Sequence, residues 1–141
     1  MYNFLLHAHS GLRYLVLLAA VVVVIKSVIG WLGNTNYTKF DKILAPSYVG
    51  LMHLQLLLGL LLYFVYSPLV TYNMKDPVER YWSVEHIALM IFAVIAAQAG
   101  RSISKKSSDD QVRFRFQTIF FGLSILLVLV GLATMPGRGI L

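Results

Sequence analysis

Four histidines are the residues of this 141-residue chain with the clearest capacity for chemistry, and three of them lie in or at the start of apolar stretches. His9 and His53 interrupt hydrophobic runs, and His86 follows Glu85 at the start of another. An ionisable side chain is costly in such a stretch, so it usually faces a protein interior and marks a site. Imidazole can bind a metal, move a proton or form a hydrogen bond. His7 lies two residues from His9 and is expected on the opposite helix face.

Other reactive constellations are absent from the sequence. It contains no cysteine, which excludes disulfides, cysteine-bound zinc, iron–sulfur clusters and a covalently attached c-type haem. There is no phosphate-binding glycine loop, no H-E-x-x-H and no G-x-S-x-G;. A metal would therefore be held by histidine, methionine or carboxylate.

The composition is that of a membrane protein. Hydrophobic residues make up 58% of the chain and charged residues only 13%, about half the charged share of a typical soluble domain, which is ~25%. The net charge of +6 comes from basic residues beside apolar spans, which indicates contact with lipid headgroups and excludes nucleic acid as a partner. The lipid bilayer is thus the expected surrounding.

Four apolar stretches are expected to cross the bilayer, at about 4–32, 43–66, 81–100 and 116–135, with polar loops between them. The runs are continuous and do not alternate, and backbone groups in hydrocarbon must be paired internally, so the spans are helices. Short connections predict antiparallel neighbours. The expected fold is an all-α integral membrane four-helix bundle, running up-down-up-down, with residues 1–141 forming one transmembrane domain.

The distribution of lysine and arginine predicts the orientation. The first and third connections, 33–42 and 101–115, hold most of the basic residues together with the nearby Lys26. Because cytoplasmic loops carry the excess of positive charge, these connections are expected inside, and both termini outside.

His9 and His86 are expected at the same depth. Counted from the basic residues Lys26 and Arg101 at ~1.5 Å per helical residue, they lie ~25 and ~22 Å from the cytoplasmic side;. They belong to the first and third spans, which are diagonal in a sequential bundle. Two level imidazoles on diagonal helices could clamp a haem iron as its axial ligands. His53 lies ~16 Å from the cytoplasmic side by the same count and matches less well.

Neighbouring residues fit this interpretation. Arg13 lies one turn from His9 and could pair with a haem propionate, although a snorkelling role is the alternative. Small residues, Ala93, Ala97 and Gly100, share the face of His86 and either leave space for a macrocycle or form a helix-packing surface;. Gly11 and Gly50 could let a ring approach the backbone.

The segments HSGLRY at 9–14, HLQLLLG at 53–59 and VEH at 84–86 resemble those of small bacterial four-helix membrane proteins labelled cytochrome b-like. The Gln-x-x-x-Gly spacing and the histidines near helix starts are also similar to one four-helix half of haem A synthase. This chain differs from that enzyme in having a single bundle and no glutamate on its first His-bearing helix. The resemblance implies a haem-binding bundle in the bacterial inner (cytoplasmic) membrane and a place in the respiratory chain.

These observations predict a multi-pass b-type cytochrome subunit that transfers electrons between quinol and a respiratory partner. His9 and His86 would ligate the iron of haem b, Arg13 would assist, and His53 would serve a quinone or second site, or replace one ligand. Other subunits of a membrane complex are the expected partners. The alternative is a haem-free accessory or assembly subunit of such a complex.

Overall fold

The computed structural model describes residues 2–66 and 75–134, and these are almost entirely helical. Helix α1 spans Tyr2–Gly33, and α2 spans Lys39–Leu61 and continues into the wide-turned π-helix η1, Leu62–Tyr66. The third long helix is built from α3, Pro77–Arg80, the π-helix η2, Tyr81–Glu85, and α4, His86–Lys106. Helix α5 spans Asp110–Ala133. Four of these segments are long and apolar enough to cross a membrane.

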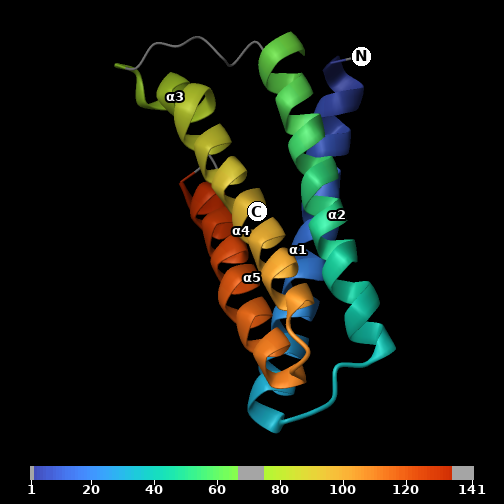
Figure 1. Ribbon diagram of the computed structural model, residues 1–141. Coiled ribbons are helices and arrows are strands. Elements are labelled where there is room, and N and C mark those ends of the chain that lie inside the picture. Colours follow the sequence, from blue (N-terminus) through green and yellow to red (C-terminus); the bar gives the residue numbers. More distant parts are fainter. Residues whose placement is uncertain (1, 67–74, 135–141) are drawn as a thin grey trace.

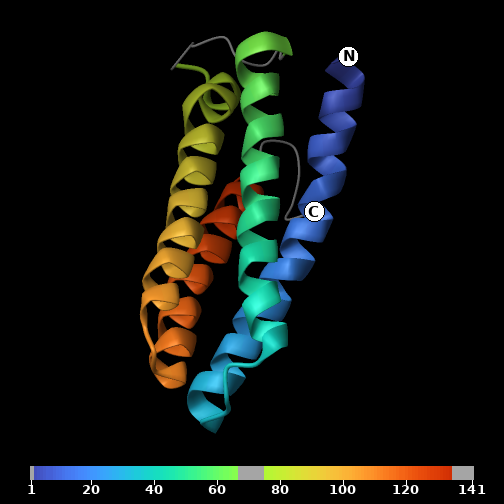
Figure 2. The same ribbon diagram turned by 45° about the vertical axis from the view of Figure 1, so that its right-hand side comes forward.

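The helices run in alternating directions and form a four-helix bundle (Figures 1 and 2). Helix α1 packs against α2 and α5, and α4 packs against the same two helices. The order around the bundle is therefore α1, α2, α4, α5, which places α1 and α4 on a diagonal. No strand occurs in residues 2–66 or 75–134. The expected all-α membrane bundle is confirmed.

The helices extend further than the expected spans. The segment 101–115, expected as a loop, is helical except for residues 107–109, and α2 already begins at Lys39. Hydropathy marks the part of a helix that suits hydrocarbon, whereas side-chain caps decide where a helix starts. Asp109 caps α5 by accepting hydrogen bonds from the backbone of Gln111 and Val112. The connection 67–74 and the segment 135–141, which includes the expected end of the fourth span, lie outside the described residues.

The end of the bundle that holds the connections 34–38 and 107–109 is called the closed end, and its apolar core is tightly packed. The rings of Tyr48 and Phe121 are fully buried with centroids 5.3 Å apart. Phe114 is also fully buried and lies where a Cβ on Gly30 would be 2.6 Å from its ring. Only a glycine at residue 30 permits this close approach of α1 and α5.

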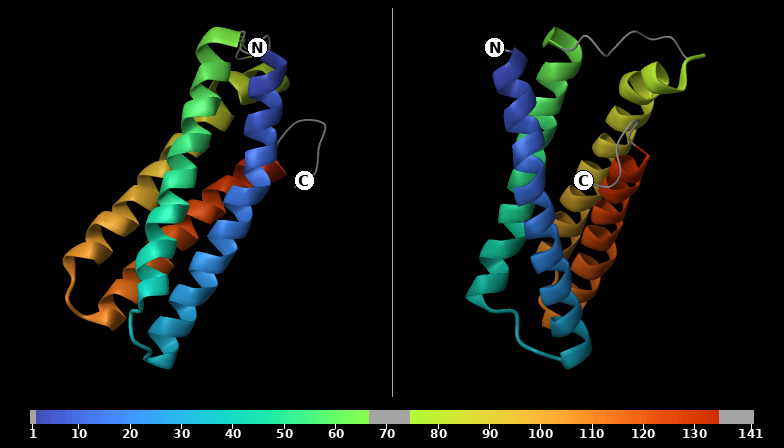
Figure 3. Two further views of the ribbon diagram at one scale, coloured as in Figure 1. Left: turned by 90° about the vertical axis from the view of Figure 1, so that its right-hand side faces the viewer. Right: turned by 180° about the vertical axis from the view of Figure 1, so that it is seen from behind.

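Toward the opposite end, which holds the N-terminus and is called the open end, the α1–α2 pair diverges from the α4–α5 pair (Figure 3, right). Large apolar side chains such as Phe4, Phe64 and Phe92 are exposed on the outside of the bundle. Lipid tails are a suitable environment for such a surface, because they tolerate apolar groups. The divergence leaves room inside the bundle at the level of His9 and His86.

Candidate functional site

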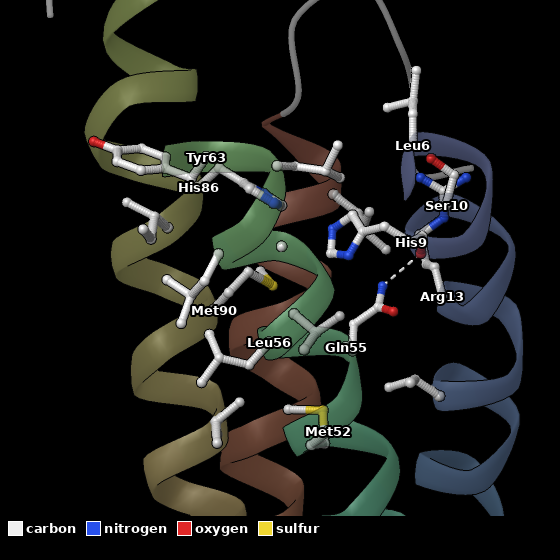
Figure 4. Close-up of a pocket in the computed structure, with 18 of the residues that line it drawn as sticks. Leu6, His9, Ser10, Arg13, Met52, Gln55, Leu56, Tyr63, His86 and Met90 are labelled. Carbon is white, nitrogen blue, oxygen red and sulfur yellow. Dashed lines mark hydrogen bonds between the residues drawn. The ribbon is translucent and has the colours of Figure 1, made fainter. Parts of the chain in front are cut away.

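A partly open cavity of about 290 Å³ lies between the two diverging helix pairs. All four long helices contribute to its wall, as do the two π-helical turns η1 and η2. The lining is mainly apolar, and Arg13 is the one formally charged residue among the described residues of the wall. The side chains labelled in Figure 4 are Leu6, His9, Ser10, Arg13, Met52, Gln55, Leu56, Tyr63, His86 and Met90.

His9 of α1 and His86 of α4 point toward one another across this cavity (Figure 4). Their ring centroids are 6.3 Å apart and the ring planes are perpendicular. A first-row metal held by two opposed imidazoles at ~2.0–2.1 Å from each nitrogen would place the ring centres about 6–6.5 Å apart. The separation of the two rings therefore fits one metal ion between them.

The contact between Tyr81 and Nδ1 of His86 favours the tautomer that a metal needs. The Tyr81 hydroxyl donates to the backbone carbonyl of Gly131 at 2.6 Å, so its oxygen is left to accept from His86 Nδ1 at 3.4 Å. A proton held on Nδ1 leaves the lone pair on Nε2. Metal-binding histidines commonly use their second nitrogen in this way.

Three buried polar atoms at the cavity have no hydrogen-bond partner among the described residues: His9 Nδ1, Arg13 Nε and Gln55 Oε1. Gln55 does fix the backbone locally, because its Nε2 donates to the carbonyl of His9 at 2.7 Å. An unsatisfied buried polar group costs about 1–3 kcal/mol. Several such groups in one cavity indicate a place where a bound polar molecule or water completes the hydrogen bonding.

Local backbone features position the two histidines. The π-helix η2 ends directly before His86, and η1 supplies Leu62 and Tyr63 to the wall. Wide π turns occur frequently at functional sites, since the extra residue re-aims the side chains that follow. On α2, a Cβ at Gly59 would lie 3.1 Å from Cε1 of His9. The glycine thus makes room for the imidazole.

Other expected residues lie elsewhere. His53 is exposed on the outside of the bundle, where its Nε2 is 2.9 Å from Oε1 of Gln98, and it does not line the cavity. His7 is exposed and its Nδ1 is 2.7 Å from the carbonyl of Asn3. Glu85, the residue before His86, pairs with Arg80 at 3.2 Å.

The small-residue face of α4 is a packing surface. Ala93 and Ala97 are fully buried, and a Cβ on Gly100 would lie 2.7 Å from Cβ of Phe120 on α5. None of the three lines the cavity, and Gly11 and Gly50 have open space around them and do not line it either. Of the two alternatives for the face of α4, the structure supports the packing surface. The expectation that Gly11 and Gly50 let a ring approach the backbone is wrong, because the space comes from the divergence of the helix pairs.

Three residues of the site were not among those predicted from the sequence. Gln55 and Gly59 form the Gln-x-x-x-Gly spacing noted above, which was the available signal. Tyr81 stands at the polar start of the third span, where an interfacial aromatic is expected, yet it is almost completely buried. Its contact with His86 depends on the π turn and has no signature in hydropathy.

The residues present fit a haem better than a metal held by the protein alone. Among the described residues, no group of three or more His, Asp or Glu side chains is placed to hold an ion. Two opposed imidazoles are, however, the complete protein contribution to an iron whose other four ligands belong to a macrocycle. The apolar wall suits the ring, and the unpartnered Nε of Arg13 suits an acidic substituent.

Comparisons of the chain with protein-family models, with curated proteins and with solved structures gave no match. The resemblance to cytochrome b-like bundles therefore stays a prediction.

Proposed function

We propose that this chain is a membrane-embedded b-type cytochrome in which His9 and His86 are the axial ligands of one haem. The observation that carries the proposal is the opposed pair of imidazoles, 6.3 Å apart across an apolar cavity. Bound haem would supply a one-electron Fe(III)/Fe(II) couple. The protein would hold the two imidazoles, fix the tautomer of His86 through Tyr81 and keep the cavity wall apolar.

Arg13 is proposed as the contact for a propionate. Its side chain lies beside the cavity, one Nη donates to the Tyr14 hydroxyl at 3.0 Å, and Nε is buried without a partner. A carboxylate at Nε would satisfy that donor and balance the charge.

Electron transfer is the activity that suits this cavity. Apart from His9 and His86, the described lining residues include no carboxylate and no lysine. With both imidazoles bound to iron, the wall would therefore keep no carboxylate, lysine or free imidazole to act as acid or base in hydrolysis. A single haem can receive an electron and pass it on, and with one cavity of this kind in the described part the chain needs a partner subunit as acceptor. We therefore infer a role between membrane quinol and another respiratory subunit.

His53 is proposed as the contact for quinol. It is exposed on the seam of α2 and α4, and its partner Gln98 donates to the Ser102 hydroxyl at 3.0 Å. A hydrogen-bonded polar chain on a lipid-facing seam can engage the oxygen of a quinol dissolved in the bilayer. His53→Ala is expected to keep the haem while slowing its reduction by quinol, measured by stopped-flow absorbance. An unchanged rate, or loss of haem, would reject this role.

We place the protein in the bacterial inner membrane with both termini outside. The basic residues of the closed end support this orientation. A cysteine introduced at the exposed Ser108, between α4 and α5, is expected to react with a membrane-impermeant maleimide only after the cells are opened. Labelling in intact cells would reverse the orientation.

The proposal is tested by the absorption spectrum of the protein purified in detergent from haem-replete cells. A six-coordinate low-spin haem is expected, with a Soret band that shifts on reduction with dithionite. A colourless protein with an intact helical circular dichroism spectrum would instead support the haem-free accessory subunit.

A further inference from the structure

A second cavity, of about 250 Å³, lies at the closed end of the bundle, far along the helices from the two histidines. It is formed by the connection after α1, the start of α2, the end of α4 and the start of α5. Its lining residues are Tyr37, Lys42, Arg101, Ser104, Lys105 and Arg113. Four of these six residues are cationic and none is acidic.

The positive charge of this cavity is largely uncompensated. Arg113 pairs with Asp110 at 3.1 Å, which accounts for one of the four cations. Within residues 2–66 and 75–134, no carboxylate pairs with Lys42, Arg101 or Lys105. The nearby Asp41 forms an ion pair with Lys26 at 2.9 Å. An excess of three positive charges around one hollow is unfavourable unless an anion is attracted to it.

The remaining lining groups are neutral and held in place. Burial raises the pKa of Tyr37, an effect opposed by the hydrogen bond from Gln117 and by the charges of Arg101 and Arg113. The phenol therefore keeps its proton at neutral pH and adds no negative charge. Arg113 is fixed by a hydrogen bond from Nε to the carbonyl of Ser107 at 2.7 Å, and its guanidinium lies 5.3 Å from the centre of the Tyr37 ring. Part of the cavity is thus preorganised.

The position of the cavity favours a lipid as the source of the anion. It lies at the ends of membrane-spanning helices, on the side that the distribution of basic residues predicts to be cytoplasmic. The apolar side chains of Phe40, Ile43 and Ile103 are exposed on α2 and α4, the same two helices that carry three of its cations. Basic pockets at this level of a membrane protein are suited to anionic headgroups, whose acyl chains lie in the surrounding bilayer.

We propose that this basic cavity binds the phosphate headgroup of an anionic phospholipid, with Arg101, Lys105, Lys42 and Arg113 surrounding the phosphate. A free phosphate shares this chemistry but has no acyl chains to place in the bilayer around the apolar helices. The site is separate from the cavity of His9 and His86, so either proposal can fail without the other.

The test uses the full chain in a neutral detergent, titrated with dioctanoyl-phosphatidylglycerol, dioctanoyl-phosphatidylcholine or inorganic phosphate and followed by native mass spectrometry and thermal shift. Phosphatidylglycerol is expected to bind and raise the unfolding temperature, whereas phosphatidylcholine and phosphate at the same concentration are not. The double variant Arg101→Gln/Lys105→Gln is expected to bind phosphatidylglycerol roughly tenfold to thirtyfold more weakly.

The matched control is Lys39→Gln/Lys106→Gln, which removes the same charge from exposed positions at the same level that do not line the cavity. It is expected to bind phosphatidylglycerol like the wild type. Equal weakening in both double variants would show general attraction to the basic end and overturn the site. An equal shift with inorganic phosphate would overturn the lipid as its source. If the first double variant does not fold, the single change at the exposed Lys42, Lys42→Gln, is measured against Lys39→Gln with the same criteria.

Discussion

The buried polar groups at the two ends of the bundle differ in whether they have hydrogen-bond partners. At the closed end, Gln117 accepts from Ser27 and donates to Tyr37, and Asp41 binds Lys26 and caps α2 through Thr38. At the open end, His9, Arg13 and Gln55 each have a buried polar atom without a hydrogen-bond partner in the part of the chain that the structure describes. Both regions are apolar overall, and both contain polar residues from several helices.

This difference separates structural polar residues from residues kept for a ligand. A buried polar network that is complete stabilises one arrangement of the helices. An incomplete network destabilises the ligand-free protein. A ligand that supplies the missing partners therefore stabilises the folded state. Substitutions at the two ends should therefore have different consequences for stability and for binding.

The largest effect on stability is expected from Asp41→Ala. The carboxylate is only 2% exposed, binds Lys26 and accepts two hydrogen bonds from Thr38. Its loss should lower the free energy of unfolding by about 3 kcal/mol, since Lys26 would remain partly buried without a partner and α2 would lose its cap. Titration with sodium dodecyl sulfate in mixed micelles measures this change. Asp109→Ala, which removes an exposed cap of α5, should cost about 1 kcal/mol, and an equal cost for both would contradict the account.

The second prediction compares the stability effects of replacing two glutamines, one at each end of the bundle. Gln117→Leu should lower the free energy of unfolding by about 2 kcal/mol, because the Ser27 and Tyr37 hydroxyls lose a buried partner;. Gln55→Leu should change the stability of the ligand-free protein by less than about 1 kcal/mol, because one hydrogen bond is lost while an unsatisfied oxygen is removed;. The same micelle titration compares them. Equal costs would remove the distinction between the two ends.

A smaller effect is expected from Tyr81→Phe at the open end. The variant loses the oxygen that accepts from His86 Nδ1, so the imidazole is oriented less firmly and becomes a weaker ligand;. Haem affinity should fall about tenfold, and the reduction potential should rise as the ligand becomes less basic. A spectroscopic redox titration measures the potential. Tyr48→Phe is the control, because its hydroxyl bonds Ser124 away from the cavity, and it should leave the potential unchanged.

The fold could be predicted from the sequence because the apolar runs are long and continuous. Helix ends could not, since caps such as Asp109 and the helical segments beyond the apolar core depend on hydrogen bonds rather than hydropathy. The level of His9 and His86 followed from the constant rise of a helix, and the structure places the two rings opposite one another. Haem binding stays a prediction.

The rest of the site depended on features that periodicity does not record. The divergence of the helix pairs, rather than Ala93 and Ala97, creates the space, and these alanines serve packing. Tyr81 contacts His86 because of a π turn that no residue pattern predicts. His53, the most deeply placed histidine, is directed outward to Gln98, because depth along a helix does not determine which face a side chain occupies.

The most direct test of the account is the haem content and spectrum of four single variants expressed in the same haem-replete cells. His9→Ala and His86→Ala should each lose the low-spin spectrum and most of the bound haem, because each removes one of two opposed ligands. His7→Ala and His53→Ala should retain the wild-type spectrum, since neither side chain lines the cavity. Wild-type spectra in both His9→Ala and His86→Ala would contradict the central claim that the open end of the bundle is a bis-histidine haem site.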